Sequence, residues 1–270
     1  MSFSTSLSGM RNAETDLRVI ANNIANAETV GFKKSNASFA DLVARGSSTD
    51  PRRTPGIGST IQAITQDFSL GALEQTGRGL DLAINGDGFF TSVNANNGTE
   101  TYSRNGNLRI DATGQLLDAN NNFVQSFAVD AAGVATTNVP ATISVPTTNA
   151  GGFELASVSI EGTGIVTAVY GDGSAEPVFQ IALASFAAAT GLRPIGQNDF
   201  EATGESGVAV FGAPASGNYG ELFSGALERS NVDLAAELVA LLGAQRNFQA
   251  NARALDTATA ISQTVLNLQR

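Results

Sequence analysis

The two ends of the chain carry apolar residues at the spacing of long helices that pack along one face. Near the N-terminus this spacing is seven residues, at Phe3, Met10, Leu17 and Ile24. Near the C-terminus the same spacing occurs at Leu234, Leu241, Phe248 and Leu255. A repeat of seven is typical of a helix whose apolar stripe lies along a second helix, as in a coiled coil. The spacing therefore predicts one long helix at each end, and each helix needs a partner surface.

The predicted stripes run along nearly the full length of both end segments. Gly31 suits the end of the first helix, and Asp233 suits the start of the second. These stripes either pair with each other in one chain or meet neighbouring copies of it. The alternative interpretation is that both helices pack on the β core of their own chain. The predicted helix-seam and inter-subunit residues are Phe3, Leu7, Met10, Leu17, Ile20, Ile24, Leu234, Leu238, Leu241, Phe248, Leu255, Ile261 and Val265.

Between the helical ends, the sequence consists of short β-branched or aromatic runs separated by Gly, Asn and Asp. Such runs are typical of strands joined by tight turns. Residues 46–60 are rich in Ser, Pro and Gly, which predicts an extended linker. The candidate strands are residues 80–84, 88–93, 107–110, 123–129, 153–160, 164–170 and 177–186.

Together these patterns predict an α+β protein in which long N- and C-terminal helices form a coiled-coil-like domain around an all-β middle domain. We expect the N-terminal helix in residues 1–31 and an extended linker region in residues 32–70. The β-rich outer domain is expected in residues 71–226, and the C-terminal helix in residues 227–270.

The composition leaves few side chains for catalysis. The chain has no cysteine and no histidine, which excludes disulfides, thiol nucleophiles and histidine-based triads. Asp118, Asn120 and Asn122 follow the first half of a calcium loop, but Phe123 replaces the required Gly and Val129 replaces the bidentate Glu. We interpret this segment as a turn. We therefore expect no enzyme activity, no catalytic residue, no metal site and no cofactor.

The net charge of −10 is concentrated in the middle of the chain, where residues 32–225 hold nine basic and eighteen acidic residues. An acidic surface argues against nucleic acid as a partner. The N-terminus lacks the basic start and apolar run of a secretory signal, and no stretch reaches the roughly 18 uninterrupted apolar residues of a membrane span. We expect no membrane insertion and no cleaved signal peptide.

Three groups of residues, in a fixed order along the chain, carry a resemblance to a known family. They stand near the end of the first predicted helix, in the first β runs, and in the last predicted helix. The motif residues are Asn22, Asn23, Asn26, Gly31, Phe32, Asp81, Gly86, Gly88, Phe89, Phe90, Asn231, Gln245 and Arg246. In this order they resemble the bacterial flagellar axial family of rod, hook and hook-associated proteins.

The resemblance implies a structural subunit that polymerises into a hollow helical tube. The ending AQRNFQANARAL and the beginning MSFSTSLSG are similar to the hook, the flexible torque-transmitting joint between rod and filament. Many hook proteins carry an additional outer domain, so the short length implies a hook subunit without that domain. The alternative within the family is a distal rod subunit of the basal body.

The same resemblance implies the location and the partners. The expected place is the flagellum at the cell exterior, reached by type III export. The expected partners are other copies of the chain, the flagellar rod, hook-cap and hook–filament junction proteins, and the type III export apparatus. A hypothesis of another class is a secreted β-domain adhesin or enzyme with a helical stalk. That hypothesis requires a concave polar site in the β region, which the sequence does not indicate.

Overall fold

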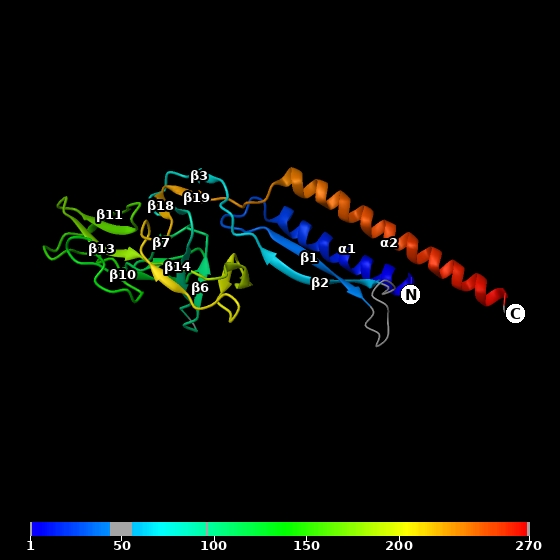
Figure 1. Cartoon of the computed structure of the whole chain (residues 1–270). Helices are drawn as coiled ribbons and strands as arrows, with labels where there is room; N and C mark the ends of the chain where they lie inside the picture. The colour runs from blue at the N-terminus through cyan, green and yellow to red at the C-terminus, as the bar shows by residue number, and fades with distance from the viewer. Residues whose placement is uncertain (1, 44–55, 96, 269–270) are drawn as a thin grey trace. The chain divides into compact units, whose positions relative to one another are not determined.

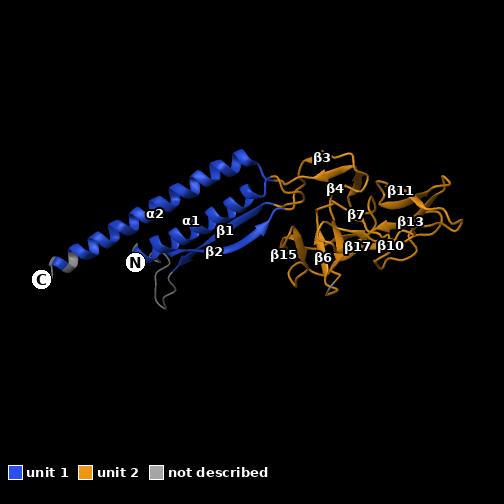
Figure 2. Ribbon diagram, turned by 180° about the vertical axis from the view of Figure 1, so that it is seen from behind, with its two compact units in different colours: residues 1–27, 34–67, 232–270 blue, residues 28–33, 68–231 orange. Residues whose placement is uncertain are grey.

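The computed structural model describes residues 2–43, 56–95 and 97–268, apart from the side chains of Ser2, Val265, Leu266 and Leu268. The described residues form two compact units (Figure 2). Unit 1 combines residues from 1–27, 34–67 and 232–270, and unit 2 combines residues from 28–33 and 68–231. Helices occupy both ends of the chain and the middle is mostly β, so the α+β prediction is confirmed.

Unit 1 contains two helices that run side by side in opposite directions (Figure 1). They are α1 (Ser2–Ala25) and α2 (Leu234–Leu268). Asn23 near the end of α1 contacts Glu237 near the start of α2, and Gly9 lies against Asn251 farther along α2. A Cβ atom at Gly9 would lie 2.6 Å from Asn251 Oδ1, so the glycine permits this close approach.

Side chains cap the C-terminal end of α1 and the N-terminal end of α2. At the end of α1, Asn26 Nδ2 donates to the Asn22 carbonyl at 2.9 Å, and the chain leaves the helix after Ala25 instead of continuing to Gly31. At the start of α2, Asp233 Oδ1 accepts from the Ala235 amide at 2.9 Å. Asp233 is therefore the capping residue that the sequence predicted.

The third part of unit 1 is an antiparallel hairpin of β1 (Ser35–Val43) and β2 (Gly56–Gln66), which lies along α1 (Figure 1). Asn12 of α1 donates to Ser59 Oγ of β2 at 2.7 Å. The expected extended linker over residues 32–70 is thus corrected, because much of its described part is paired strand. Within the expected 46–60 linker, residues 46–55 lie outside the described residues and residues 56–60 belong to β2.

Unit 2 is a β structure of several small sheets. One four-stranded sheet has the order β10-β13-β12-β11, and a larger sheet has the path β15-β16-β6-β5-β9-β8-β7, with β14 joining β5 to β17. Two further pairs, β18 with β4 and β19 with β3, complete the described strands. The strands are β3 (Leu73–Gln75), β4 (Leu82–Asn85), β5 (Phe89–Val93), β6 (Glu100–Ser103), β7 (Arg109–Ile110), β8 (Leu116–Leu117), β9 (Phe123–Val124), β10 (Ser126–Ala128), β11 (Leu155–Ile160), β12 (Ile165–Tyr170), β13 (Ala175–Ile181), β14 (Leu183–Ser185), β15 (Arg193–Gly196), β16 (Asp199–Glu201), β17 (Val210–Gly212), β18 (Glu221–Ser224) and β19 (Ala226–Glu228). A 3₁₀ turn, η2 (Ala189–Gly191), precedes β15.

Two apolar clusters form the core of unit 2. The larger cluster includes Leu82, Phe90 and Phe179, all buried. The smaller cluster is aromatic, and Phe89 packs edge-on against Phe68 with ring centroids 5.1 Å apart. Every candidate strand predicted between residues 80 and 186 contains at least part of an observed strand.

Candidate assembly site

The predicted helix seam is divided by the structure into an inner and an outer group. The inner group is buried or half-buried and comprises Leu7, Met10, Leu17, Ile20, Ile24, Leu241, Phe248 and Leu255. The outer group is exposed and comprises Phe3, Leu234, Leu238 and Ile261. The side chain of Val265 lies outside the described residues. The heptad spacing identified both groups but does not distinguish the face that packs on α1 from the face that does not.

Small and polar residues in the inner face of α2 were missed by the sequence prediction. Ala244 and Glu237 are each 2% exposed, so they are more buried than any of the predicted α2 seam residues whose side chains the structure describes. Ala244 follows Leu241 by three positions and Glu237 precedes it by four, which places all three on one helix face. A search for the helical period that included Ala and charged residues as well as Leu would have found Ala244 and Glu237.

Asn23 joins three of the four described elements of unit 1, namely α1, β1 and α2. Its Oδ1 accepts from the Ser35 amide at 2.9 Å, and its Nδ2 donates to the Ser35 carbonyl at 2.9 Å and to Glu237 Oε2 at 3.3 Å. Glu237 also receives Lys34 Nζ at 2.7 Å. Because Asn23 is 1% exposed and bonded on both amide atoms, it sets the position of α1 against β1 and α2.

The other motif residues of unit 1 face solvent or cap the helix. Asn22, Gln245 and Arg246 are exposed, and Asn26 caps α1. Asp16 of α1 is half-buried, and burial together with the nearby Glu237 charge raises the pKa of its carboxyl. The inner side of unit 1 therefore combines the polar residues Asn23, Lys34, Glu237 and Asp16 with the apolar residues of the inner group.

Unit 2 contains a buried cluster of charges around Glu228. Its Oε1 receives Lys33 Nζ at 2.5 Å and the Gly71 amide at 2.9 Å, and its Oε2 lies 3.5 Å from Arg104 Nη1. The side chains of Glu228, Lys33 and Arg104 are each at most 3% exposed. Burial lowers the pKa of the Arg104 guanidinium, and the charges of Glu228 and Asp87 oppose this shift. One carboxylate therefore faces two buried cations.

The N-terminal motif residues of unit 2 lie close to this cluster. The Gly31 amide donates to the Glu228 carbonyl at 2.8 Å, and Gly31 has a φ of +69°, which favours glycine. Phe32 is half-buried. Asn231 Nδ2 donates to Ser69 Oγ at 3.0 Å. The motif residues Gly31 and Asn231 thus bond to residues of unit 2 that are far away in the sequence, Glu228 and Ser69 respectively.

The motif in the first β runs combines buried residues with glycines at positive φ. Asp81, 1% exposed, accepts from Thr76 Oγ1 at 2.7 Å, and Phe89 and Phe90 are core residues. Gly86 and Gly88 both have φ near +130°. Gly86 also approaches Gly220 so closely that a Cβ there would lie 2.9 Å from the Gly220 Cα. These residues shape the fold of unit 2.

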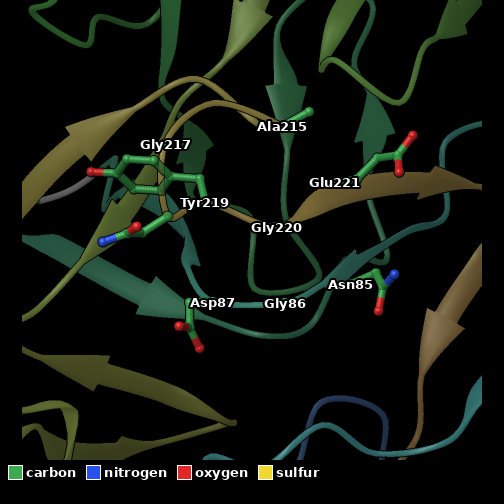
Figure 3. Close-up of a pocket in the computed structure, with 9 residues that line it drawn as sticks. Asn85, Gly86, Asp87, Ala215, Gly217, Tyr219, Gly220 and Glu221 are labelled. Carbon is green, nitrogen blue, oxygen red and sulfur yellow. The ribbon is translucent and has the colours of Figure 1, made fainter.

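A hollow of about 500 Å³ lies beside the Gly86 turn (Figure 3). Asp87 and Glu221 both line it, with the Tyr219 ring on the side of Asp87 in the view. Its lining residues supply two carboxylates and a phenol, and they include no amine, guanidinium or thiol that would complete an acid–base or nucleophilic array. Among the described residues, no group of three or more Asp and Glu side chains is arranged to hold a metal ion.

The calcium-like segment is a turn, as the sequence indicated. Asp118 Oδ1 accepts from the amides of Asn120 and Asn122, each at 2.8 Å. Asn120 Nδ2 donates to Asp199 Oδ2 at 2.9 Å, so a second buried carboxylate lies next to the first. Burial, together with the Asp118 charge, raises the pKa of Asp199 to about 6.

We expect Asp199→Asn to stabilise unit 2 at neutral pH. The raised pKa means that the folded chain holds this proton more tightly than the unfolded chain, so the free energy of unfolding falls as pH rises from about 4 to about 6. Asn resembles the protonated carboxyl, so the variant should gain about 1 to 3 kcal/mol over the parent above pH ~6 and little at pH ~4. Urea unfolding followed by circular dichroism at both pH values measures this difference. An equal gain at both values would contradict the assignment.

None of the helices in the described part of the chain is both long and apolar enough to cross a membrane.

Three family models match successive parts of the chain. Residues 3–33 match the model described as flagella basal body rod protein. Residues 83–168 match the flagellar hook protein FlgE/F/G D1 domain, and residues 224–268 match the flagellar basal body rod FlgEFG protein C-terminal model. The matches cover the three groups of motif residues apart from Asp81, which lies just before the second match.

Whole-length relatives agree with these models. The flagellar basal-body rod protein FlgG of Bacillus subtilis is 38% identical over 275 residues, covering 98% of this chain and 97% of the relative. FlgG of Agrobacterium fabrum is 34% identical over 270 residues, with 95% of each chain covered. The flagellar hook protein FlgE of Salmonella typhimurium is 30% identical over 411 residues, with both chains fully covered. Because this chain has 270 residues, that last alignment includes segments of the hook protein that this chain lacks.

Proposed function

Because the chain belongs to the family of flagellar basal-body rod and hook proteins, we propose that it is a structural subunit of the distal rod. The observation that carries the proposal is the alignment with the rod proteins, which covers 95% or more of both chains over 270 to 275 residues. A subunit of rod length and rod-like sequence throughout is best suited to a place in the rod.

The second candidate is a hook subunit without the additional outer domain. It is favoured by the similarity of residues 244–255 to hook endings and by the 30% identity to a hook protein along both full chains. The sequence motifs alone ranked this candidate first. The higher identity and matching length of the rod relatives favour the opposite order.

In either place the chain would act mechanically. Unit 1 presents exposed apolar residues of α1 and α2 to neighbouring copies, and burying one such Leu stabilises an interface by about 1.5 to 3 kcal/mol. The contact recurs at every subunit of a helical polymer, so many modest contacts hold the tube together. Unit 2, with its buried charges and closed aromatic core, would form the part of the wall outside the inner tube.

The partners that follow from this role are other copies of the chain and the axial proteins that adjoin it. We also propose that the rod, hook-cap and hook–filament junction proteins and the type III export apparatus are partners, while nucleic acid and membrane lipid are not. The relatives are named as flagellar rod and hook proteins, and we expect no catalytic activity.

Deleting the gene and imaging the isolated basal bodies separates the two candidates. If the chain is the distal rod subunit, the deletion strain should show rods that stop short, with no hook attached. Complete rods without a hook would instead support the hook. Normal flagella in the deletion strain would contradict both candidates. As a control, the parent gene supplied on a plasmid should restore normal assembly.

A further inference from the structure

The outer face of α2 carries an apolar stripe that its own chain leaves exposed. We define this outer stripe as Leu234, Leu238 and Leu242, which follow one another at intervals of four and so lie on one helix face. Their side chains are 43% to 55% exposed. The line continues at the same interval to Arg246, which is also exposed. The outer stripe is therefore apolar in its first part and cationic in its next turn.

A second exposed apolar surface of a different kind lies on the hairpin. We define the hairpin face as Phe39, Ile61 and Ile64, which are 39% to 46% exposed. The register pairs Phe39 with Ile61 and Ala37 with Ile64, which places all of them on one side of the hairpin. Asp41 lies on the same side, two residues beyond Phe39.

The hairpin face is the side on which α1 lies, and α1 covers only part of it. Phe39 and Ser59 line a hollow of about 260 Å³ together with Gly9 and Ala13 of α1 and Asn251 of α2. Ile61 and Ile64 belong to β2 and do not line this hollow. Their apolar atoms remain available beside α1.

We propose that the outer stripe of one copy packs on the hairpin face of a neighbouring copy. This inference rests on the proposed function, because it concerns copies of one chain in a tube. A contact between two different surfaces of identical subunits is heterologous, and repeating it generates an open helical polymer where the rotation between copies does not close a ring. Two unlike apolar surfaces on unit 1 meet this requirement, whereas one self-complementary surface would close into a dimer.

The charges and their spacing agree with this pairing. Arg246 follows Leu238 by eight residues of helix, a rise of about 12 Å. Asp41 follows Ala37, the partner of Ile64, by four residues of strand, a rise of about 14 Å. If Leu238 lies over Ile64, Arg246 therefore comes close to Asp41.

The direction of the elements also agrees. Asn23 bonds both Ser35 at the start of β1 and Glu237 near the start of α2, and Phe39 and Asn251 share a hollow farther along both elements. Thus β1 and α2 point the same way within unit 1. The proposed pairing also sets a neighbour's α2 parallel to β1, so the α2 helices of both copies point the same way, as a common tube axis requires.

Cysteine cross-linking tests the contact, and the absence of native cysteine makes the experiment clean. Leu238→Cys and Ile64→Cys are introduced together in the full chain, which is assembled in the producing bacterium, isolated as tubes and oxidised. A disulfide needs Cα atoms about 4.4 to 6.8 Å apart. We expect a ladder of covalent multimers on a denaturing gel, which each single variant should not give. The matched control pairs Leu238→Cys with Thr60→Cys, because Thr60 is exposed on the opposite side of the same strand.

Each outcome has a distinct meaning. A ladder from the Ile64 pair and none from the Thr60 pair supports the contact. Tubes without a ladder, a fast-migrating cross-linked monomer, or dimers from Leu238→Cys alone would overturn it while leaving the proposed function in place. If the parent chain is absent from every part of the flagellar tube, the proposed function fails independently of the cross-link.

Discussion

Glu228→Gln should destabilise unit 2 by about 3 to 5 kcal/mol, which is the expected cost of removing one partner from a buried ion pair. The change keeps the shape of the side chain but removes the charge that faces Lys33 and Arg104. The side chains of both cations are at most 3% exposed, so water cannot solvate their charges when the carboxylate is removed. Because a domain is typically stable by only about 5 to 15 kcal/mol, the midpoint of urea unfolding should fall strongly.

The control for this variant is Glu201→Gln. Glu201 pairs with Arg193 at 2.5 Å, but the Arg193 side chain is 65% exposed and that of Glu201 is 36% exposed. Exposed pairs contribute about 0 to 1 kcal/mol, so this variant should unfold almost like the parent. Equal and small effects for Glu201→Gln and Glu228→Gln would show that the buried cluster does not hold unit 2 together.

A second comparison tests whether the cluster acts as one group. Lys33→Met alone leaves Arg104, 3.5 Å away, as the remaining cation that faces the Glu228 carboxylate, and Glu228→Gln alone removes the carboxylate that faces both cations. Changing both residues removes one charge of each sign. We therefore expect the double variant to lose less free energy of unfolding than the sum of the single variants, as is usual for residues in contact.

The sequence predicts the helical ends well because their apolar spacing depends only on local geometry. The seven-residue repeat locates α1 and α2, and Asp233 marks the start of α2. The repeat gives no information on which flank of α2 packs on α1. For this reason Leu241 on the inner face and Leu238 on the outer face entered one undivided prediction.

The hairpin of unit 1 was not predicted, for a physical reason. The strand segments Ser35–Val43 and Gly56–Gln66 contain Asn, Asp, Ala and Gly, which lower the apparent preference for a strand. They surround a Pro- and Gly-rich stretch that suggests a linker. Packing against α1, which lies along one side of the hairpin, supports their pairing. This contact depends on the tertiary structure and cannot be read from the two short segments themselves.

The buried charges were also beyond sequence reasoning. Charged residues are usually exposed, and nothing in the sequence marks Lys33, Arg104 and Glu228 as buried. Lys33 and Glu228 stand 195 positions apart, and only the fold brings them together. The Asn residues near the end of α1 were predicted as motif residues, but the sequence did not show that Asn23 alone is buried and bonded to two other elements.

Leu241→Asp should prevent assembly by releasing α2 from α1. Leu241 lies on the inner face of α2, one turn from Glu237, which is 2% exposed. A new carboxylate there would be half-buried and would repel the Glu237 carboxylate, which already pairs with Lys34, so the change disfavours the packing of α2 on α1. We expect a soluble chain whose unit 2 keeps its β-type circular dichroism, whose α2 is cut readily by protease, and which forms no tubes in electron micrographs.

The matched variant is Leu242→Asp, which makes the same change at the next position. Leu242 is 55% exposed in the outer stripe, so a carboxylate there stays in water and α2 should remain as resistant to protease as in the parent. Because we place the outer stripe in the contact between copies, this variant should also fail to form tubes. The pair thus separates folding of unit 1 from association of copies. If Leu241→Asp left α2 resistant to protease, the inner face would be assigned wrongly, and if Leu242→Asp assembled normally, the outer stripe would have no role in the tube.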